Sequence, residues 1–291
     1  MKGIILAGGS GTRLYPNTHV ISKQLLPVYD KPMIYYPLST LLLGGVREIA
    51  IISTPRDLPL YREILGNGHK LGLNIEYIEQ SEPRGLADAF IVGEDFIGDD
   101  KCCLILGDNI FYGNMRLMEV FSNFEDGALV FGYPVNDPER YGVISFDVNK
   151  KIDSIVEKPK NPPSNFAVPG LYLYDNNVVK YAKTLSPSKR GELEITDLNN
   201  IYLQKNLLDC QLIGRGVAWL DAGTCESLQE AGNFIMSIEK RQSYKIGCIE
   251  EICFRQGFIK LSEFKNIISN YPKSDYRTYL CSLEKEFETL L

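Results

Sequence analysis

Long hydrophobic runs are absent from this sequence, and residues on which many enzyme mechanisms depend are scarce. No apolar run approaches the roughly 18 residues that a membrane-spanning helix needs, so no membrane partner is expected. We expect no apolar leader either, because glycines follow directly on the short run 4–7. There are two histidines, His19 and His69, and neither has a serine, cysteine or metal-ligand partner at an informative spacing. We expect both to be surface or loop residues and not acid–base catalysts.

Positive charge is also in short supply, because 31 lysines and arginines stand against 37 acidic residues, for a net charge of −6. A chain of this sign lacks the basic face that nucleic-acid binding usually needs, so no nucleic-acid partner is expected. Any anionic ligand must then be held by a local basic pocket. The seven cysteines are an odd number without C-x-x-C spacing, which favours a reduced, cytoplasmic setting over a disulfide framework.

What is present is the pattern of an α/β protein. At 291 residues, 44% of them hydrophobic, the chain can bury a substantial core. Strand-like apolar runs alternate with helical patterns; the strands are expected at 4–7, 48–53, 73–78 and 102–106, and the helices at 32–43, 58–65 and 85–96. This alternation predicts a mainly parallel sheet covered by helices on both faces, with ligands bound beyond the carboxyl ends of the strands.

The pattern changes at about residue 128. Short strands with turn residues between them, at 129–133, 143–146, 152–156 and 171–174, indicate an inserted antiparallel portion spanning about 128–175. A long amphipathic helix is expected at 227–241, and the residues after it show apolar side chains at helical spacings. We therefore expect an α/β domain at 1–240 and a helical C-terminal extension at 241–291 packed on it.

A glycine-rich loop follows the first expected strand and reads Gly8-Gly9-Ser10-Gly11-Thr12-Arg13. Glycines let the backbone turn tightly and bring N–H groups close to an anion, phosphate above all. Arg13 adds a charged fork that suits phosphate oxygens, and Lys23 is a second cation nearby in the sequence. The spacing fits neither the dinucleotide-binding G-x-G-x-x-G pattern nor a P-loop. By itself such a loop is about as often a simple turn as a phosphate-binding loop.

Two aspartates follow strand-like runs, Asp108 in Leu-Gly-Asp-Asn and Asp221 in Trp-Leu-Asp-Ala. Carboxylates at the ends of two strands could meet over one sheet edge and hold a hard cation. Magnesium suits such a site, because it commonly takes one or two carboxylates together with substrate phosphates and waters. The alternative is that each aspartate is a turn residue or a helix N-cap.

Taken together, Leu-Ala-Gly-Gly-Ser-Gly-Thr-Arg-Leu at 6–14 and Ser-Lys-Gln-Leu-Leu-Pro at 22–27 resemble the signature of the sugar-phosphate nucleotidylyltransferases. The resemblance extends from Gly3 to about Phe258 and is closest to the branch that uses dTTP and α-D-glucose 1-phosphate. It implies a Rossmann-like α/β fold, a Mg²⁺ cofactor and in-line attack of the sugar phosphate on the α-phosphorus, as the first step of dTDP-L-rhamnose-type sugar biosynthesis. The nucleophile is already an anion at pH 7, so no general base is required.

The resemblance also implies roles residue by residue. As catalytic groups it implies Arg13, Lys23, Asp108 and Lys158, and as metal ligands Asp108 and Asp221. The implied nucleotide contacts are Gly8, Gly9, Gly11, Thr12, Arg13, Gln24, Gln80, Gly85 and Asp108. The implied sugar-phosphate contacts are Asn109, Tyr141, Gly142, Glu157, Lys158 and Val168. Arg190 is a further candidate to reach the phosphates.

Two of these positions carry expectations about conformation or base reading. Pro159 restricts the residue before it, so Lys158 is expected to be extended. Gln24 and Gln80 match base-contacting positions, where an amide offers both a donor and an acceptor. Asp88 is a departure, because glutamine is expected there; we expect it to affect only solvent or a secondary contact. UTP- or GTP-dependent transferases, and a non-catalytic nucleotide-sugar sensor, stay open as alternatives.

The segment 248–255, Cys-Ile-Glu-Glu-Ile-Cys-Phe-Arg, resembles the family's C-P-E-E-I-A-x-R element, which helps form subunit contacts and a second nucleotide-sugar site. This implies a homotetramer, and feedback by dTDP-rhamnose at the second site. Ile249 and Cys253 replace the proline and the alanine, and Asn114 lies in a short, altered loop. These departures leave the function of the second site open.

Overall fold

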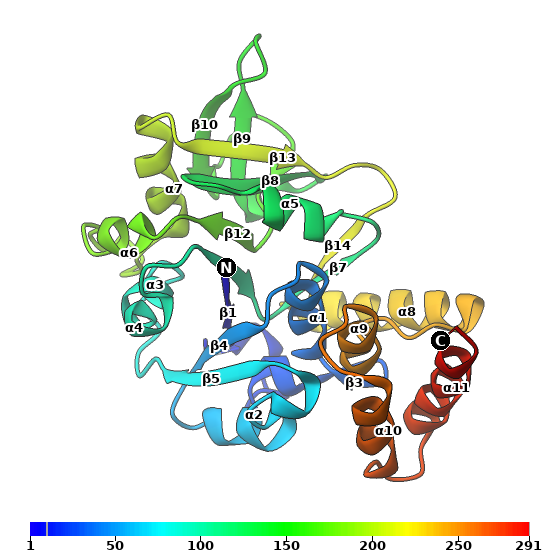
Figure 1. Cartoon of the computed structure of the whole chain (residues 1–291). Helices are drawn as coiled ribbons and strands as arrows, with labels where there is room; N and C mark the ends of the chain where they lie inside the picture. Colours follow the sequence, from blue (N-terminus) through cyan, green and yellow to red (C-terminus); the bar gives the residue numbers. More distant parts are fainter. Residues whose placement is uncertain (10, 291) are drawn as a thin grey trace.

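The computed structural model describes residues 1–9 and 11–290, and side chains as far as residue 288. A ten-stranded mixed sheet runs through the molecule in the order β10-β9-β11-β8-β12-β6-β1-β4-β5, with β13 paired to β8 (Figure 1). Its strands are β1 (Lys2–Leu6), β4 (Glu48–Ser53), β5 (Asn74–Glu79), β6 (Cys102–Leu106), β8 (Ala128–Pro134), β9 (Gly142–Phe146), β10 (Ile152–Glu157), β11 (Phe166–Ala167), β12 (Leu171–Tyr174) and β13 (Leu208–Leu212).

The sheet has a parallel half and an antiparallel half. Strand β1 pairs parallel with β4 and with β6, and β4 pairs parallel with β5. Strand β12 pairs antiparallel with both β6 and β8, so it joins the inserted strands to the parallel core in one continuous sheet. The expected fold class, a mainly parallel sheet with an inserted antiparallel portion, is confirmed. Two small ladders lie outside the sheet, β2 (Pro27–Val28) with β3 (Lys31–Pro32) and β7 (Asn109–Tyr112) with β14 (Ala218–Asp221).

Helices cover both faces of the sheet. Successive residues of the central strand β1 point to opposite faces, so each packs against a different set of helices. Ile5 packs into one core with α1, α2 and the C-terminal helices, and Ile4 into another with α3, α4, α6 and α7. Both isoleucines are fully buried. The helices are α1 (Tyr35–Leu43), α2 (Leu58–Leu65), α3 (Asp88–Val92), α4 (Glu94–Ile97), α5 (Leu117–Asn123), α6 (Asn177–Ala182), α7 (Ile195–Gln204), α8 (Cys225–Gln242), α9 (Ile249–Arg255), α10 (Leu261–Ser269) and α11 (Asp275–Leu290).

Two expected helices have different bounds. The first begins at Tyr35 and not at residue 32, because residues 31–32 pair with residues 27–28 in a hairpin. The helix expected at 85–96 begins at Asp88, since Gly85 has a φ of +109°, outside the helical range, and it is divided at Gly93 into α3 and α4. Strand β7 and helix α5 were not expected from the sequence. No helix in the described part of the chain is long and apolar enough to cross a membrane.

Candidate active site

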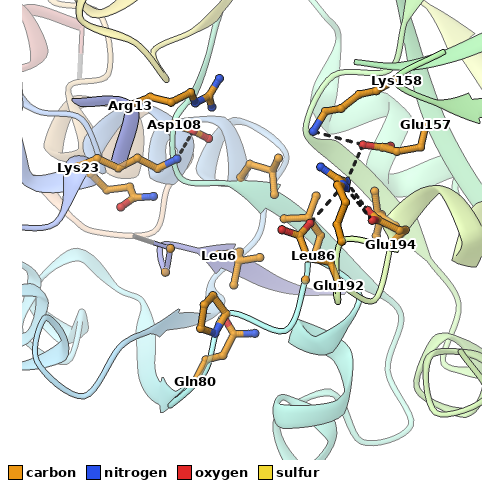
Figure 2. Close-up of a pocket in the computed structure, with 18 residues that line it drawn as sticks. Leu6, Arg13, Lys23, Gln80, Leu86, Asp108, Glu157, Lys158, Glu192 and Glu194 are labelled. Atoms are coloured by element: carbon orange, nitrogen blue, oxygen red, sulfur yellow. Dashed lines mark hydrogen bonds and ion pairs between the residues drawn. The ribbon is translucent and has the colours of Figure 1, made fainter. Parts of the chain in front are cut away.

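Two adjoining hollows, of about 340 and 490 Å³, lie beyond the carboxyl ends of the parallel strands. Gly8, Gln80 and Asp108, which follow β1, β5 and β6, all line the first hollow, as the α/β topology predicts. The charged residues that line both hollows are Arg13, Asp108, Glu157 and Lys158. Figure 2 shows Arg13 and Asp108 on one wall and Lys158 on the wall opposite.

The residues assigned from the sequence divide between these hollows. The first is lined by most of the expected nucleotide contacts: Gly8, Gly9, Arg13, Gln24, Gln80, Gly85 and Asp108, together with Lys23. The second is lined by every expected sugar-phosphate contact and by Asp221: Asn109, Tyr141, Gly142, Glu157, Lys158 and Val168. Gly11 and Thr12 line neither hollow, and Gly11 is turned toward Thr18, whose hydroxyl donates to the Gly11 carbonyl at 2.8 Å.

The glycine-rich loop depends on left-handed backbone conformations. Gly9 and Gly11 have φ values of +109° and +57°, which side-chain-bearing residues rarely adopt. Gly8 lies against Gln80, because a Cβ at Gly8 would stand 3.2 Å from Gln80 Oε1. After Gly11 the chain makes a short 3₁₀ turn, Thr12–Leu14, that carries Arg13 into both hollows.

Asp108 is buried and ion-paired with Lys23, as Figure 2 shows. Burial raises the pKa of Asp108, but the charge and the hydrogen bond of Lys23 outweigh it, and the Asn109 amide adds a bond at 3.2 Å, so the pKa lies below the ordinary value. Asp108 is therefore an anion at neutral pH with a cation held beside it.

Asp221 is brought to Asp108 by the pairing of β14 with β7, in which Asp221 lies opposite Asn109. Burial raises the pKa of Asp221 and repulsion by Asp108 raises it further, against the charges of Arg13, Lys23 and Arg140. Among the residues that the structure describes, no cluster of three or more potential metal-ligating side chains occurs. Two neighbouring, repelling carboxylates fit Mg²⁺, which needs few protein ligands when substrate phosphates supply the others.

The far wall of the site is formed at the end of β10. Glu157 accepts hydrogen bonds from Thr196 Oγ1 at 2.6 Å and from Arg190 Nη2 at 3.2 Å. Lys158 has a φ of +42° and is not extended, so that expectation is wrong. The chain leaves the sheet at this residue, whose N–H still donates to the Tyr141 carbonyl at 3.0 Å.

Asn109 is held by the protein at both ends of its amide. Its Nδ2 donates to Asp108, and its Oδ1 accepts from Trp219 Nε1 at 2.7 Å and from the Gly170 N–H at 3.0 Å. Asn109 therefore links β6, β14 and the segment before β12, and it fixes the position of Asp108. Trp219 lines the second hollow, where its ring contacts Tyr141 with the centroids 5.0 Å apart.

Several lining residues were not assigned from the sequence. Glu192 and Glu194 line the first hollow beside Arg190, whose guanidinium pairs with Glu194 at 2.7 Å. Arg140 and Thr196 line the second. The run Arg190-Gly191-Glu192-Leu193-Glu194 could have indicated the two glutamates, because it places alternate charges next to the Arg190 candidate. Thr196 lies two residues after this run, where it was expected only to cap the following helix, but the structure places it inside α7.

Asp88 is not a solvent contact. Its side chain is fully buried, and its carboxylate accepts from Gln80 Nε2 at 2.8 Å and from Arg84 Nη2 at 2.7 Å. Of the two expected roles, solvent contact is therefore excluded, and Asp88 is a secondary contact that reaches the site through Gln80. The two histidines are exposed, as expected.

This geometry, a glycine-rich loop and an aspartate pair beside two adjoining hollows, is accompanied by clear similarity to known proteins. Residues 2–238 match the model of the nucleotidyl transferase family, to which the chain therefore belongs. Its fold is shared with a solved UDP-glucose pyrophosphorylase, at a TM-score of 0.72 and 24% identity, covering 83% of this chain and 99% of that one.

Closer relatives give the branch of that family. The chain is 54% identical to a glucose-1-phosphate thymidylyltransferase of Xanthomonas campestris pv. campestris over 98% of this chain and 97% of that protein, and 52% identical to one of Neisseria meningitidis over 98% and 100%. A crystallised candidate glucose-1-phosphate thymidylyltransferase of Bacillus anthracis is 46% identical, with a TM-score of 0.75 over 80% of this chain and 94% of that one. The chain belongs with the glucose-1-phosphate thymidylyltransferases, which confirms the resemblance seen in the sequence.

Proposed function

We propose that this protein joins dTTP to α-D-glucose 1-phosphate, giving dTDP-glucose and pyrophosphate. The observation that carries this function is the pair of adjoining hollows that share Arg13, Asp108 and Lys158. One hollow offers phosphate and base contacts, the other offers hydroxyl and phosphate contacts, and the shared charges lie where two phosphate groups would meet.

The reaction needs positioning more than proton transfer. A phosphate oxygen of the sugar phosphate forms a bond to the α-phosphorus, and the bond from that phosphorus to the bridging oxygen of the β-phosphate breaks in line with it. Because the nucleophile is already an anion, the two substrates repel one another. The protein must therefore hold them together and neutralise the charge in the transition state.

Each basic side chain then has a task. The amides of Gly8 and Gly9, which line the first hollow, and the Arg13 guanidinium hold the leaving β- and γ-phosphates. Lys23, fixed beside Asp108, neutralises charge near the α-phosphate, and Lys158 holds the attacking phosphate from the opposite wall. Glu157, oriented by Thr196, accepts hydrogen bonds from sugar hydroxyls.

Magnesium fits this site through Asp108 and Asp221, whose mutual repulsion raises the pKa of Asp221. When bound, the ion would supply positive charge to the nucleotide phosphates and the sugar phosphate. The side chains of Arg13 and Lys23 act on the same pair of carboxylates and reduce the repulsion between them.

The quaternary arrangement is a further part of this proposal. We infer a cytoplasmic homotetramer with a catalytic portion at 1–240, a helical extension at 241–291 and a second nucleotide-sugar site near α9 that takes dTDP-rhamnose. Ile249 and Cys253, which depart from the family pattern, are buried in the core below α9. On the same helix the exposed Arg255 pairs with the mostly buried Glu251 at 2.8 Å, so this pair is kept beside the two departures.

A pyrophosphate-release assay with glucose 1-phosphate and dTTP, UTP or GTP tests the proposed function. We expect turnover with dTTP to exceed turnover with the other two nucleotides. One extra methyl group changes the free energy of binding in a pocket by only about 1–3 kcal/mol, so we expect turnover with UTP to be nearer to that with dTTP than turnover with GTP. Preference for UTP or GTP would replace the proposal by another transferase of the family, and nucleotide binding without any turnover would replace it by a sensor.

A further inference from the structure

Two buried glutamine side chains, Gln24 and Gln80, line the nucleotide hollow, with only 1% and 6% of their surface exposed. A glutamine amide has a donor end, NH₂, and an acceptor end, C=O. When the protein occupies one end, the other end is left for a ligand. The protein occupies opposite ends of these two amides.

Gln80 has its donor end occupied. Its Nε2 donates to Asp88 Oδ2 at 2.8 Å, and the other oxygen of the same carboxylate accepts from Arg84 Nη2 at 2.7 Å. A carboxylate paired with a guanidinium can only accept hydrogen bonds, so the NH₂ group of Gln80 must face Asp88. Among the described residues no donor bonds to Gln80 Oε1, which lies toward Gly8 at the wall of the hollow.

Gln24 has its acceptor end occupied. Its Oε1 accepts from Ser22 Oγ at 2.7 Å and lies 3.4 Å from the Tyr61 hydroxyl, which also donates to Ser22 Oγ at 2.9 Å. Tyr61 is fully buried and Ser22 nearly so, which keeps this chain of hydroxyls in place. Gln24 Nε2 is left as a donor, on the side of the amide that faces Gly107.

We infer that Asp88 is the positioning residue that sets the sense of Gln80, so that this amide offers its oxygen to the hollow and favours a base with an N–H group there, as thymine and uracil have. This rests on the proposed function, because it assumes that the base of the nucleotide lies against Gln80. Gln80 Oε1 accepts from the ring N3–H, and Gln24 Nε2 donates to a carbonyl oxygen of the base. Guanine shows the same edge and must be excluded by size.

Cytosine presents the reverse pattern at the same ring positions. Its N3 is an acceptor and would face the Gln80 oxygen, so two buried acceptors would lie together without a proton between them. Gln80 cannot rotate to correct this without giving up its bond to Asp88, because a carboxylate has no hydrogen to donate to the amide oxygen. A site built to hydrogen-bond one pattern rejects the mismatched base much more strongly than a purely apolar pocket does.

The test compares binding of dTTP and dCTP to full-length wild-type protein and to the Asp88→Asn variant by titration calorimetry. An asparagine can present either its oxygen or its nitrogen to Gln80, so the amide of Gln80 is free to turn. We expect the ratio of the two dissociation constants to fall about tenfold or more in D88N, through tighter dCTP binding, weaker dTTP binding, or both. Asp95→Asn, which removes the same charge from the exposed side of α4, should leave the ratio unchanged.

A ratio measured on one preparation does not depend on the fraction of folded protein, so a merely structural role of Asp88 would not change it. An unchanged ratio in D88N overturns the inference. If D88N does not fold, the wild-type protein still tests the inference, because equal affinity of the wild type for dTTP and dCTP would overturn the inference as well. Failure of wild-type protein to turn over dTTP with glucose 1-phosphate would instead refute the proposed function. Turnover of dTTP with an unchanged ratio would refute this inference alone.

Discussion

Asp221 lies directly opposite Asn109 in the antiparallel pairing of β14 with β7, next to Asp108 at the end of β6. This register places two carboxylates from distant parts of the chain within range of mutual repulsion, which raises the pKa of Asp221. The Asn109 amide, bonded at one end to Asp108 and at the other to Trp219, keeps the first carboxylate in position. The charged centre of the site therefore depends on a two-stranded ladder outside the main sheet.

Removal of one of these carboxylates should abolish magnesium-dependent turnover. In Asp108→Asn the pair loses a charge, and Lys23 loses its ion-pair partner. We expect turnover to fall by about 10² or more, as for loss of a preorganised charged group, and to respond little to added Mg²⁺. Pyrophosphate release measured over a range of Mg²⁺ concentrations checks this, with the exposed Asp99→Asn as control. Magnesium-dependent turnover intact in D108N would refute the metal assignment.

Loss of the Arg13 guanidinium should act on the chemical step. Arg13 lines both hollows, and we assign its guanidinium to the departing phosphates. Arg13→Ala should therefore lower kcat by about 10²–10³. Steady-state kinetics with saturating glucose 1-phosphate measure this. Arg215→Ala removes an exposed arginine that lines neither hollow and should behave as wild type. The assignment fails if kcat of R13A is unchanged.

Lys158 should act on the sugar phosphate and not on dTTP binding. Lys158→Ala is expected to raise the KM for glucose 1-phosphate and to lower kcat by about tenfold or more, while the dissociation constant of dTTP changes little. Lys160→Ala, two residues further along and also exposed, is the matched control. A variant that loses affinity for dTTP and keeps its KM for the sugar phosphate would reverse the roles of the two walls.

The two aspartates should respond oppositely to pH in metal-free protein. Folding lowers the pKa of Asp108, so this group stabilises the folded state above its unfolded pKa of about 3.9, and the contribution is lost as the pH falls through the folded value. Folding raises the pKa of Asp221, so ionisation of this group destabilises the folded state. The destabilisation begins as the pH rises through the unfolded pKa and is complete above the raised, folded pKa.

Thermal unfolding at a series of pH values, with a chelator present, measures this difference. At pH 7 we expect Asp108→Asn to have a lower Tm than wild type and Asp221→Asn a higher one. Both differences should shrink toward zero in acid, where the wild-type carboxyls are protonated in the folded and unfolded states. Shifts of the same sign in the two variants would contradict the assigned directions.

Gly85 should be intolerant of any side chain. Its φ is +109°, and a Cβ would stand 2.5 Å from the backbone N and O of Leu193, which bonds to the carbonyl of Arg84 and to the N–H of Ala87. Gly85→Ala should lower the free energy of unfolding by about 1–3 kcal/mol and weaken dTTP binding. Denaturant unfolding measures the first effect. Gly214→Ala, where a Cβ meets nothing within 4 Å, should cost much less.

Sequence alone was sufficient for the features that depend on short-range order. The apolar runs predicted β1, β4, β5 and β6, and their order along the chain placed Gly8, Gln80 and Asp108 at one edge of the sheet. The glycines of the loop and the charges of Arg13 and Lys23 predicted a phosphate site at the same edge, and this stays a prediction. These signals lie within a few residues of one another, where backbone geometry and periodicity act directly.

Only the tertiary structure decided the relationships between distant residues. The meeting of Asp108 with Asp221 required the β7–β14 ladder, and β7, which begins three residues after the last residue of β6, was not expected from the sequence. Lys158 has a left-handed backbone at the point where the chain leaves β10, although the local effect of Pro159 favours an extended one. Asp88 departs from the family pattern, and only the structure shows that it is buried and accepts hydrogen bonds from Gln80 and Arg84. Which end of a glutamine amide faces a ligand depends on the residue bonded to the other end. That residue is known only once the tertiary structure shows which side chains lie beside the amide.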